Sequence, residues 1–302
     1  MSTPTRRVEA LPVQQIAQVD GLVDGPRWLV RSLWTEQAVG FIGGPPKSCK
    51  SWLGLDLAVS VASATPCLGG YQVDQPGPVL IYLAEDDPAA VRYRVAGLCA
   101  HRGLALNALN LQLITVRGWR LDVPEHRQGL EATIKQLRPR LLLLDPLVRL
   151  HRLDENSASE ISGLLGFLRE IQIIYATAIV LVHHMSKRSR AQLGYALRGS
   201  SDLFAWADSN AYLLRQDQQL TLTLEHRGAP ATDPIPLVLA NGPPGAGPHL
   251  EVASEEHREQ PRPDAALAEA VRRALAAATG PLTRTALRQA LHINNQRLAW
   301  IS

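Results

Sequence analysis

The sequence predicts an α/β fold with a mostly parallel sheet flanked by helices, antiparallel strands at one edge and a small helical C-terminal appendage. Between residues 38 and 182, short and almost purely apolar runs alternate with amphipathic stretches. This pattern is typical of parallel strands that helices bury on both faces. After residue 208, three short apolar runs follow one another without a helical stretch, which indicates hairpins. Helical periodicity returns from residue 265.

The totals of the sequence fit one large domain with an appendage. The chain has 302 residues, of which 46% are apolar and 20% charged, as in ordinary soluble globular proteins. A net charge of +3 permits contact with nucleic acid without arguing for it. Three cysteines without paired spacing argue against a disulfide framework or a zinc site. No apolar run approaches the roughly 20 residues that span a bilayer, so we expect a cytoplasmic protein without membrane contact.

Composition divides the chain into four segments. Residues 1–36 lack a clear period and form an N-terminal segment that leads into the core. Residues 37–240 hold the alternating pattern and form the core. Residues 241–264 are rich in Gly, Pro and charge and are predicted to be a linker. Residues 265–302 form a helical tail, which is either a partial helix-turn-helix or a packing appendage.

The elements of the predicted core follow one another in a regular order. Strands are expected at residues 39–42, 79–83, 111–116, 141–144, 177–182, 210–214, 220–225 and 235–239. Helices are expected at residues 50–62, from Pro88 to a stop at Gly103, and after a capping box formed by Ser157 and Glu160. Asp87 directly precedes Pro88, which suits an N-cap followed by the first helical turn.

A phosphate-binding motif lies between the first predicted core strand and its helix. The pattern is Gly, any four residues, Gly, Lys and then Ser or Thr. Gly44 opens it, and Lys50 and Ser51 close it at the correct spacing. Backbone N–H groups of such a loop wrap a phosphate, Lys50 would neutralise the β- and γ-phosphates, and the Ser51 hydroxyl would ligate Mg²⁺. The predicted nucleotide-binding residues are Gly43, Gly44, Pro45, Pro46, Lys47, Ser48, Cys49, Lys50, Ser51 and Trp52. The alternative, a Gly-Pro turn before an ordinary helix, is disfavoured by the strand before the loop and by the strand ending in Asp further on.

Cys49 takes the position of the second glycine in this motif. It could be a small residue that the loop tolerates, and this interpretation is favoured. It could also narrow the loop and weaken nucleotide binding. A third interpretation is redox sensitivity, because a thiol at a helix N-terminus beside Lys50 should ionise more easily.

Two acidic residues at predicted strand ends are candidates for chemistry. Asp145 ends an all-leucine strand, and a carboxylate there, next to the phosphate loop, would hold Mg²⁺; the alternative is a helix cap. Glu85 ends another strand and could orient and deprotonate an attacking water. Asp86 and Asp87 compete for that role.

A pair of histidines, His183 and His184, ends the fifth predicted strand. Neighbouring strand residues face opposite sides, so only one of them can face the nucleotide. We expect His184 to be the sensor that hydrogen-bonds the γ-phosphate, with a purely structural pair as the alternative. The basic residues at 187–190 form either a solvated surface or a surface that faces DNA.

Four blocks of the sequence together resemble one known family. The first block is residues 43–51, and the second runs from Tyr82 to Pro88 and contains Ala-Glu-Asp-Asp. The third is residues 144–151. The fourth runs from Val182 to Lys187, contains His-His-Met-Ser-Lys and is followed by Arg198-Gly-Ser-Ser. They resemble the RecA-like ATPases of the RepA-like hexameric replicative helicase group, the AAA_25-type ATPases, over residues 27–239.

The resemblance implies a RecA-like core, ATP and Mg²⁺, and a homo-oligomer, often a hexameric ring, that moves on single-stranded DNA. It assigns Lys50 and Ser51 to the phosphates and metal, Glu85 to the base, Asp145 to Mg²⁺ and His184 to the sensor. We therefore expect an ATP-hydrolysing protein that associates with single-stranded or duplex DNA. The alternative is a weak ATPase that acts as a nucleotide-gated switch for DNA or a protein partner in a mobile-element or defence system.

The sequence departs from the family pattern at two places. Cys49 replaces a glycine, and the stretch where an arginine finger is expected reads Ala207-Asp208-Ser209. Such a finger stabilises transition-state charge across a subunit interface. Arg198, Arg215 or Arg227 could replace it.

Overall fold

The structure is a computed structural model that describes residues 11–19, 25–155, 157–185, 201–216, 219–242, 247–254 and 271–276. The chain divides into two compact units, Met1–Val252 and Ala253–Ser302. In the second unit, residues 271–276 are helical. The helix-turn-helix predicted in residues 281–302 lies outside the described residues.

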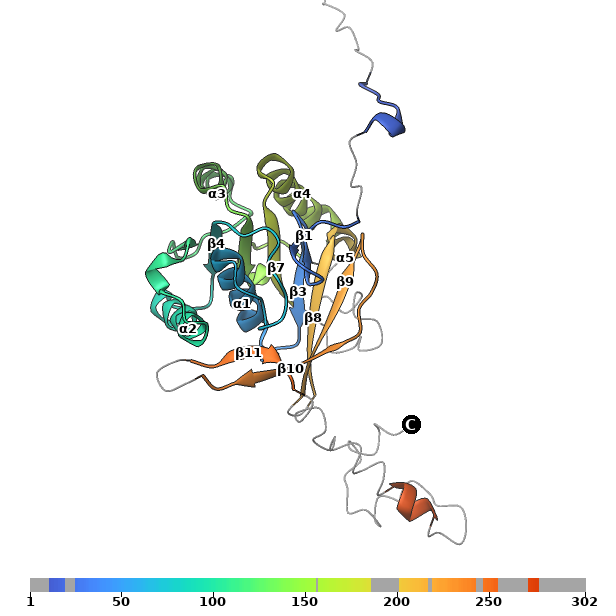
Figure 1. Ribbon diagram of the computed structural model, residues 1–302. Helices are drawn as coiled ribbons and strands as arrows, with labels where there is room; N and C mark the ends of the chain where they lie inside the picture. Colours follow the sequence, from blue (N-terminus) through green and yellow to red (C-terminus); the bar gives the residue numbers. More distant parts are fainter. Residues whose placement is uncertain are drawn as a thin grey trace, which may run out of the picture. The chain divides into compact units, whose positions relative to one another are not determined.

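The first unit is built on a sheet in which nine strands are described, in the order β11-β10-β9-β8-β3-β7-β6-β4-β5 (Figure 1). The strands are β3 (Val39–Gly44), β4 (Val79–Leu83), β5 (Leu111–Leu113), β6 (Leu141–Asp145), β7 (Ala178–His184), β8 (Ser209–Gln216), β9 (Gln219–His226), β10 (Ile235–Ala240) and β11 (His249–Val252). Pairing is parallel from β8 through β3 to β5, and antiparallel from β8 outward to β11. The predicted α/β class, with antiparallel strands at one edge, is confirmed.

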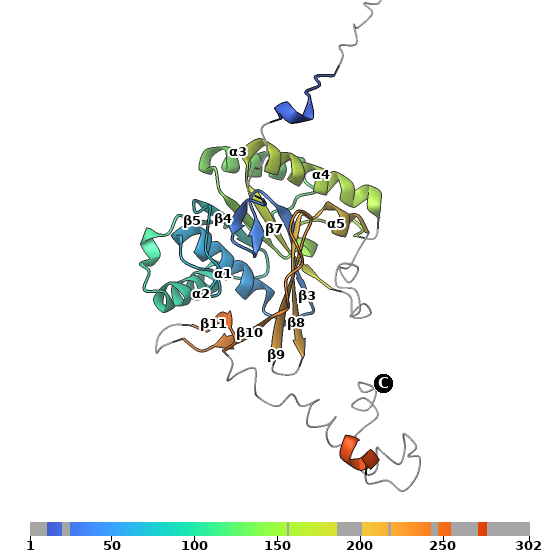
Figure 2. The same ribbon diagram turned by 45° about the vertical axis from the view of Figure 1, so that its right-hand side comes forward.

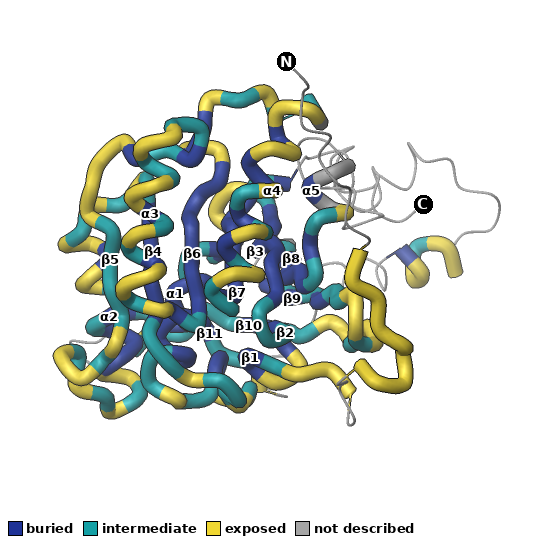
Figure 3. Tube along the Cα trace, turned by 90° about the horizontal axis from the view of Figure 1, so that it is seen from above, coloured by how far each residue is buried: buried dark blue, intermediate teal, exposed yellow. Residues whose placement is uncertain are grey.

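Helices cover both faces of the parallel part. They are α1 (Lys50–Ser63), α2 (Pro88–His101), α3 (Pro124–Leu137), α4 (Ala158–Tyr175) and α5 (Ser201–Trp206). The described residues also include the short 3₁₀ helices η1 (Ile16–Gln18), η2 (Leu106–Ala108) and η3 (Leu147–Arg149), of which η1 has no buried residue. Buried residues of α1 and α2 pack in one apolar cluster, and those of α3 and α4 pack in another. Alternate residues of each central strand join opposite clusters, such as Leu143 and Leu142 of β6. The two helical layers are visible in Figure 2, and the buried strands between them in Figure 3.

Several local expectations are confirmed. The bounds of β4 are those predicted, and α1 and β6 differ from the prediction by one residue at one end. Asp87 caps α2 by accepting a hydrogen bond from the backbone N–H of Ala89 at 2.9 Å.

Other local expectations are wrong. The capping box is not formed, because the Ser157 side chain makes no cap hydrogen bond, and Glu160 instead accepts one from the backbone N–H of Asp154. Strand β5 ends at Leu113, and the chain beyond it lines a cleft. Helix α3 was not expected, and β11 lies within residues 241–264, where a linker was expected.

The N-terminal segment contributes a small ribbon, in which β1 (Trp28–Val30) pairs antiparallel with β2 (Trp34–Thr35). Leu29, Leu33 and Trp34 are fully buried there, so this ribbon packs into the core. None of the described helices is both long enough and apolar enough to cross a membrane.

Candidate functional site

The predicted site residues gather at the carboxyl ends of the parallel strands. Strands β3, β4, β6 and β7 run in the same direction, so their ends meet at one edge of the sheet. Leu83 of β4 pairs with Asp145 of β6, and Gly44 of β3 pairs with His184 of β7. The backbone N–H of Ala84 donates to the Asp145 carbonyl at 2.7 Å. The loop after β3, the acidic loop after β4 and the end of β6 therefore share this edge.

The loop between β3 and α1 has the conformation of an anion cradle. Lys47 and Cys49 have φ angles of +64° and +65°, and left-handed residues in such a turn direct backbone N–H groups into a concave nest. A Cβ atom added to Gly44 would lie 2.5 Å from the carbonyl oxygen of Leu213 and 2.5 Å from Ser48 Oγ. Only glycine fits at that position. Ser48 is fully buried, and its hydroxyl has no hydrogen-bond partner among the described residues.

Lys50 begins α1 and turns its side chain back into this loop. Its Nζ donates to the carbonyl oxygen of Pro45 at 2.8 Å, and the residue is only 6% exposed. Burial lowers the pKa of Lys50, while the nearby Asp145, Cys49 and Glu85 oppose that shift. The ammonium group is thus held inside the loop, close to two carboxylates.

Asp145 is the buried acid of the site. It is 6% exposed, and burial raises its pKa from 3.8 to about 6, opposed by a hydrogen bond from Ser51 and by the charge of Lys50. Its Oδ2 atom has no hydrogen-bond partner within the described part of the chain. A hydroxyl and a carboxylate are the hard oxygen ligands that Mg²⁺ prefers, so these residues fit the ion that the fold implies.

The acidic loop after β4 gives each of its three carboxylates a different partner. Glu85 Oε1 lies 2.6 Å from Arg149 Nε, and both side chains are more than half exposed. Arg94 holds Asp86 through two hydrogen bonds of 2.8 and 2.9 Å. Asp87 is the cap of α2. Exposed ion pairs are weak, so Glu85 is the carboxylate that can most easily turn toward a reacting water.

Arg149 and Arg94 were missed in the sequence. Arg149 lies in η3, four residues after Asp145, and reaches Glu85 only because η3 returns toward the end of β4. Arg94 also lies over the ring of Trp52, 5.6 Å from its centroid. The predicted nucleotide-binding residue Trp52 is therefore half-buried against α2.

The two histidines at the end of β7 differ in environment. His183 is 1% exposed, with its ring 6.0 Å from that of Phe41. His184 is half-buried beside Gly44, the first glycine of the loop. This placement is compatible with His184 as the sensor. The basic residues at 187–190 and Arg198 lie outside the described residues.

Two of the arginines considered as fingers bind within their own chain. Arg215 Nη1 donates to the carbonyl oxygen of Lys47 at 3.4 Å, which places the guanidinium at the phosphate loop. Arg227 forms an ion pair with Asp208 at 3.1 Å.

The surroundings of Cys49 disfavour the third interpretation, in which its thiol ionises easily. The residue is half-buried, and burial raises the pKa of its thiol, although Arg215 and Lys50 oppose the shift. Loss of solvent therefore outweighs the neighbouring positive charges. The unusual feature of Cys49 is its left-handed backbone, which glycine adopts without strain.

A cleft of about 350 Å³ adjoins this edge of the sheet. It is lined by residues 82–88, which include the end of β4, by Val91, and by residues 113–118, which begin at the end of β5. Because Glu85 is among these residues, the cleft opens beside the candidate base.

Together, the strand order, the phosphate loop and the strand-end carboxylates define a RecA-like P-loop ATPase fold. The chain belongs to the AAA_25 family, whose model, described as an AAA domain, matches residues 4–190.

Solved structures with this fold include two similar proteins. The RadB recombinase matches with a TM-score of 0.54 and 16% identity, over 72% of this chain and 92% of that one. The KaiC-like protein PH0186 from Pyrococcus horikoshii matches with a TM-score of 0.50 and 14% identity, over 75% and 94%. At these identities the likeness concerns the fold.

Proposed function

We propose that this protein binds ATP with Mg²⁺ and hydrolyses it at the carboxyl edge of the parallel strands. The observation that carries the proposal is the buried Asp145 carboxylate beside Lys50 and Ser51, whose Oδ2 has no hydrogen-bond partner in the described residues. A buried carboxylate is costly unless a cation or hydrogen bonds compensate it. A metal ion bound with the nucleotide would supply that compensation.

Each residue of the site has a role in this proposal. Lys50 neutralises the β- and γ-phosphates, the loop N–H groups hold them, and Ser51 and Asp145 hold the ion. When bound, Mg²⁺ offsets the phosphate charge that develops during hydrolysis. Glu85 leaves Arg149, orients the attacking water and accepts its proton. His184 donates a hydrogen bond to the γ-phosphate.

The proposal is tested by ATP binding and turnover of three variants. Lys50→Ala should weaken ATP binding and reduce turnover by at least about 100-fold, because the phosphates lose their main counter-charge. Glu85→Gln should bind ATP within a few-fold of wild type yet lose about 100-fold or more of turnover. Asp87→Asn, in the same loop, is the control and should keep both. Normal ATP binding by Lys50→Ala would refute the phosphate-loop assignment.

We further propose that turnover is coupled to DNA in a RepA-like homo-oligomer, a hexameric ring in which single-stranded DNA stimulates hydrolysis. The four sequence blocks support this. Turnover with and without single-stranded DNA, together with the mass in solution with ATP and Mg²⁺, tests it. Six subunits and stimulated turnover are expected.

A second candidate function is a slow, nucleotide-gated switch for DNA or a protein partner. The left-handed Cys49 in the loop favours it, because a side chain at this glycine position would slow hydrolysis without preventing nucleotide binding. A monomer or dimer whose slow turnover ignores DNA would favour the switch over the motor.

A further inference from the structure

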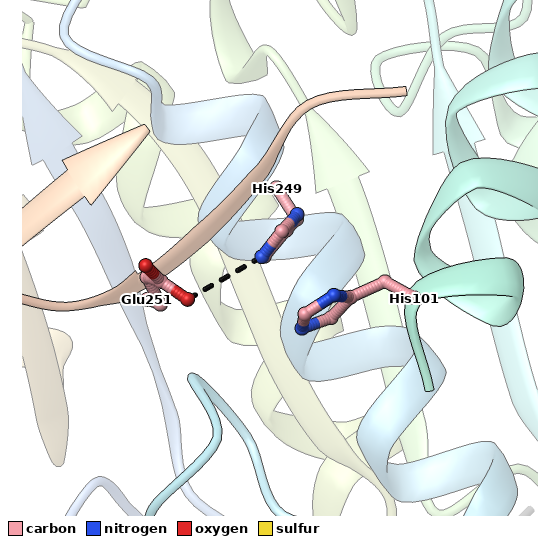
Figure 4. Close-up of side chains that lie close together, drawn as sticks. All are labelled: His101, His249 and Glu251. Atoms are coloured by element: carbon pink, nitrogen blue, oxygen red, sulfur yellow. Dashed lines mark ion pairs between the residues drawn. The ribbon is translucent and has the colours of Figure 1, made fainter. Parts of the chain in front are cut away.

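Three side chains that are far apart in the sequence meet where β11 crosses the end of α2. His101 lies in the last turn of α2, and His249 and Glu251 lie two residues apart on β11 (Figure 4). Their ligand atoms all lie within 4.8 Å of one another. The imidazole rings stack with centroids 3.5 Å apart, and His249 Nε2 lies 3.4 Å from Glu251 Oε2.

The backbone is built to bring these residues together. A Cβ atom added to Gly97, one turn before His101 on α2, would lie 2.7 Å from the backbone nitrogen of Gly247. The segment before β11 therefore packs directly on the helix, because Gly97 has no side chain that would hold it away. Two residues later this close approach places His249 against His101.

Within this cluster, His249 is the buried residue whose ring nitrogens have no hydrogen-bond partner among the described residues. The residue is 3% exposed. Buried polar groups in native proteins nearly always have a hydrogen-bond partner, so an exception indicates that a ligand or another partner binds there. His101 is exposed to solvent and gives an ion access to the cluster.

We propose that His101, His249 and Glu251 bind a Zn²⁺ ion, with water as the fourth ligand. Two imidazole nitrogens and one carboxylate oxygen form a common zinc ligand set, whereas Mg²⁺ and Ca²⁺ select oxygen ligands. Tetrahedral bonds of about 2.1 Å place ligand atoms about 3.4 Å apart, so rotation of the exposed His101 ring closes the set. The cysteine pattern could not reveal this site, since its ligands are histidines and a glutamate.

The ion would fasten the last strand of the sheet to the core. Strand β11 is the edge strand and pairs only with β10 among the described strands. Zinc would join it to α2, whose other end carries the acidic loop of the ATP site. An ion that binds only the folded state raises its stability, so zinc should raise the melting temperature.

The test is a Zn²⁺ titration of the full chain without nucleotide and in excess Mg²⁺, so that the ATP site does not take up zinc. Wild type should bind one Zn²⁺ per chain through this cluster, with a higher melting temperature. His101→Asn and Glu251→Gln, both at sites open to solvent, should bind at least tenfold more weakly and lose the thermal shift. His126→Asn is the matched control and should behave as wild type, because its amide oxygen can replace the ring nitrogen that accepts from Arg120 N.

Absence of zinc binding by wild type, or equal binding by all three variants, would overturn the proposal. X-ray absorption of zinc-loaded wild type gives a second test that needs no variant. Two imidazoles and no sulfur around the ion are expected. Sulfur ligation or a single imidazole would also overturn it.

Discussion

Two buried aspartates of the first unit, Asp56 and Asp145, differ in how fully their carboxylate oxygens are hydrogen-bonded and paired. Asp56, in α1, is 1% exposed and forms an ion pair of 2.7 Å with Arg102. It also accepts hydrogen bonds from the backbone N–H of Leu68 at 2.8 Å and from the Cys67 thiol. Asp145, at the end of β6, is almost as buried, yet its Oδ2 lacks a hydrogen-bond partner in the described structure.

The contrast shows that Asp56 stabilises the fold, whereas Asp145 keeps a carboxylate oxygen available for a ligand. Arg102 is itself satisfied, since its Nη1 also donates to Ser60 and Thr65, so the Asp56 network is closed. At Asp145 the protein tolerates an undercompensated charge, which is the condition expected of a ligand for a cation. Breaking each site should therefore change stability in opposite directions.

The largest effect is expected from Asp56→Asn. Removing the charge leaves the buried Arg102 guanidinium without its partner, which should lower the free energy of unfolding by about 3–5 kcal/mol. Chemical denaturation measures it. Asp74→Asn, which breaks the exposed pair with Arg31, is the control and should cost less than about 1 kcal/mol. A loss of similar size in both variants would show that burial of the Asp56 pair carries no special weight.

Asp145→Asn should change the free energy of unfolding in the opposite direction, raising it, in protein without Mg²⁺. The folded-state pKa, about 6, lies above the ordinary 3.8, so the folded state resists ionisation and loses stability as the pH rises from about 4 to about 6. Above pH 6 the full cost of the buried Asp145 charge is present in the free energy of unfolding. Asp145→Asn removes it and should raise the free energy of unfolding at pH 7.5 by up to about 3 kcal/mol.

The pH dependence provides the control for this prediction. The gain from Asp145→Asn should shrink as the pH falls below 6 toward 4, because Asp145 of wild type is then protonated in the folded state and its charge is no longer buried. Denaturation curves at pH 4.5 and 7.5 measure the difference. A gain that is equal at both pH values, or a loss at pH 7.5, would contradict the view that the charge of Asp145 is only partly compensated.

How well the sequence predicted these features depends on how local their causes are. The bounds of β4 and β6 follow from apolar runs, and the convergence of Asp145, Glu85 and His184 follows from parallel strands ending at one edge. Helix α3 was missed because, of its residues, only Leu130 and Ile134 are buried, which leaves a weak apolar stripe.

Other features depend on contacts that no local pattern encodes. The Glu85–Arg149 pair needs the return of η3, and the Asp56–Arg102 pair joins α1 to the residue that follows α2. The alternative in which the Cys49 thiol ionises easily rested on helix-end charge, which is visible in a sequence, whereas the burial that raises the pKa of this thiol is not.

The smallest effect is expected from Cys49→Gly. Glycine relieves the strain of a φ angle of +65°, but it also adds backbone entropy to the unfolded chain, so the free energy of unfolding should change by less than about 1 kcal/mol. ATP should bind several-fold more tightly, because the loop wraps the phosphates without a side chain. Cys49→Ala is the matched control, since it removes the sulfur and keeps the strained backbone. Equal tightening in both variants would assign the effect to the thiol rather than to the backbone.

The most direct test of the central claim is equilibrium binding of ATP to wild type and to Asp145→Asn, each with and without Mg²⁺. If Asp145 is left available for the ion, Mg²⁺ should tighten ATP binding to wild type by about tenfold or more and should have little effect on Asp145→Asn. Equal tightening of both proteins by Mg²⁺ would contradict the account.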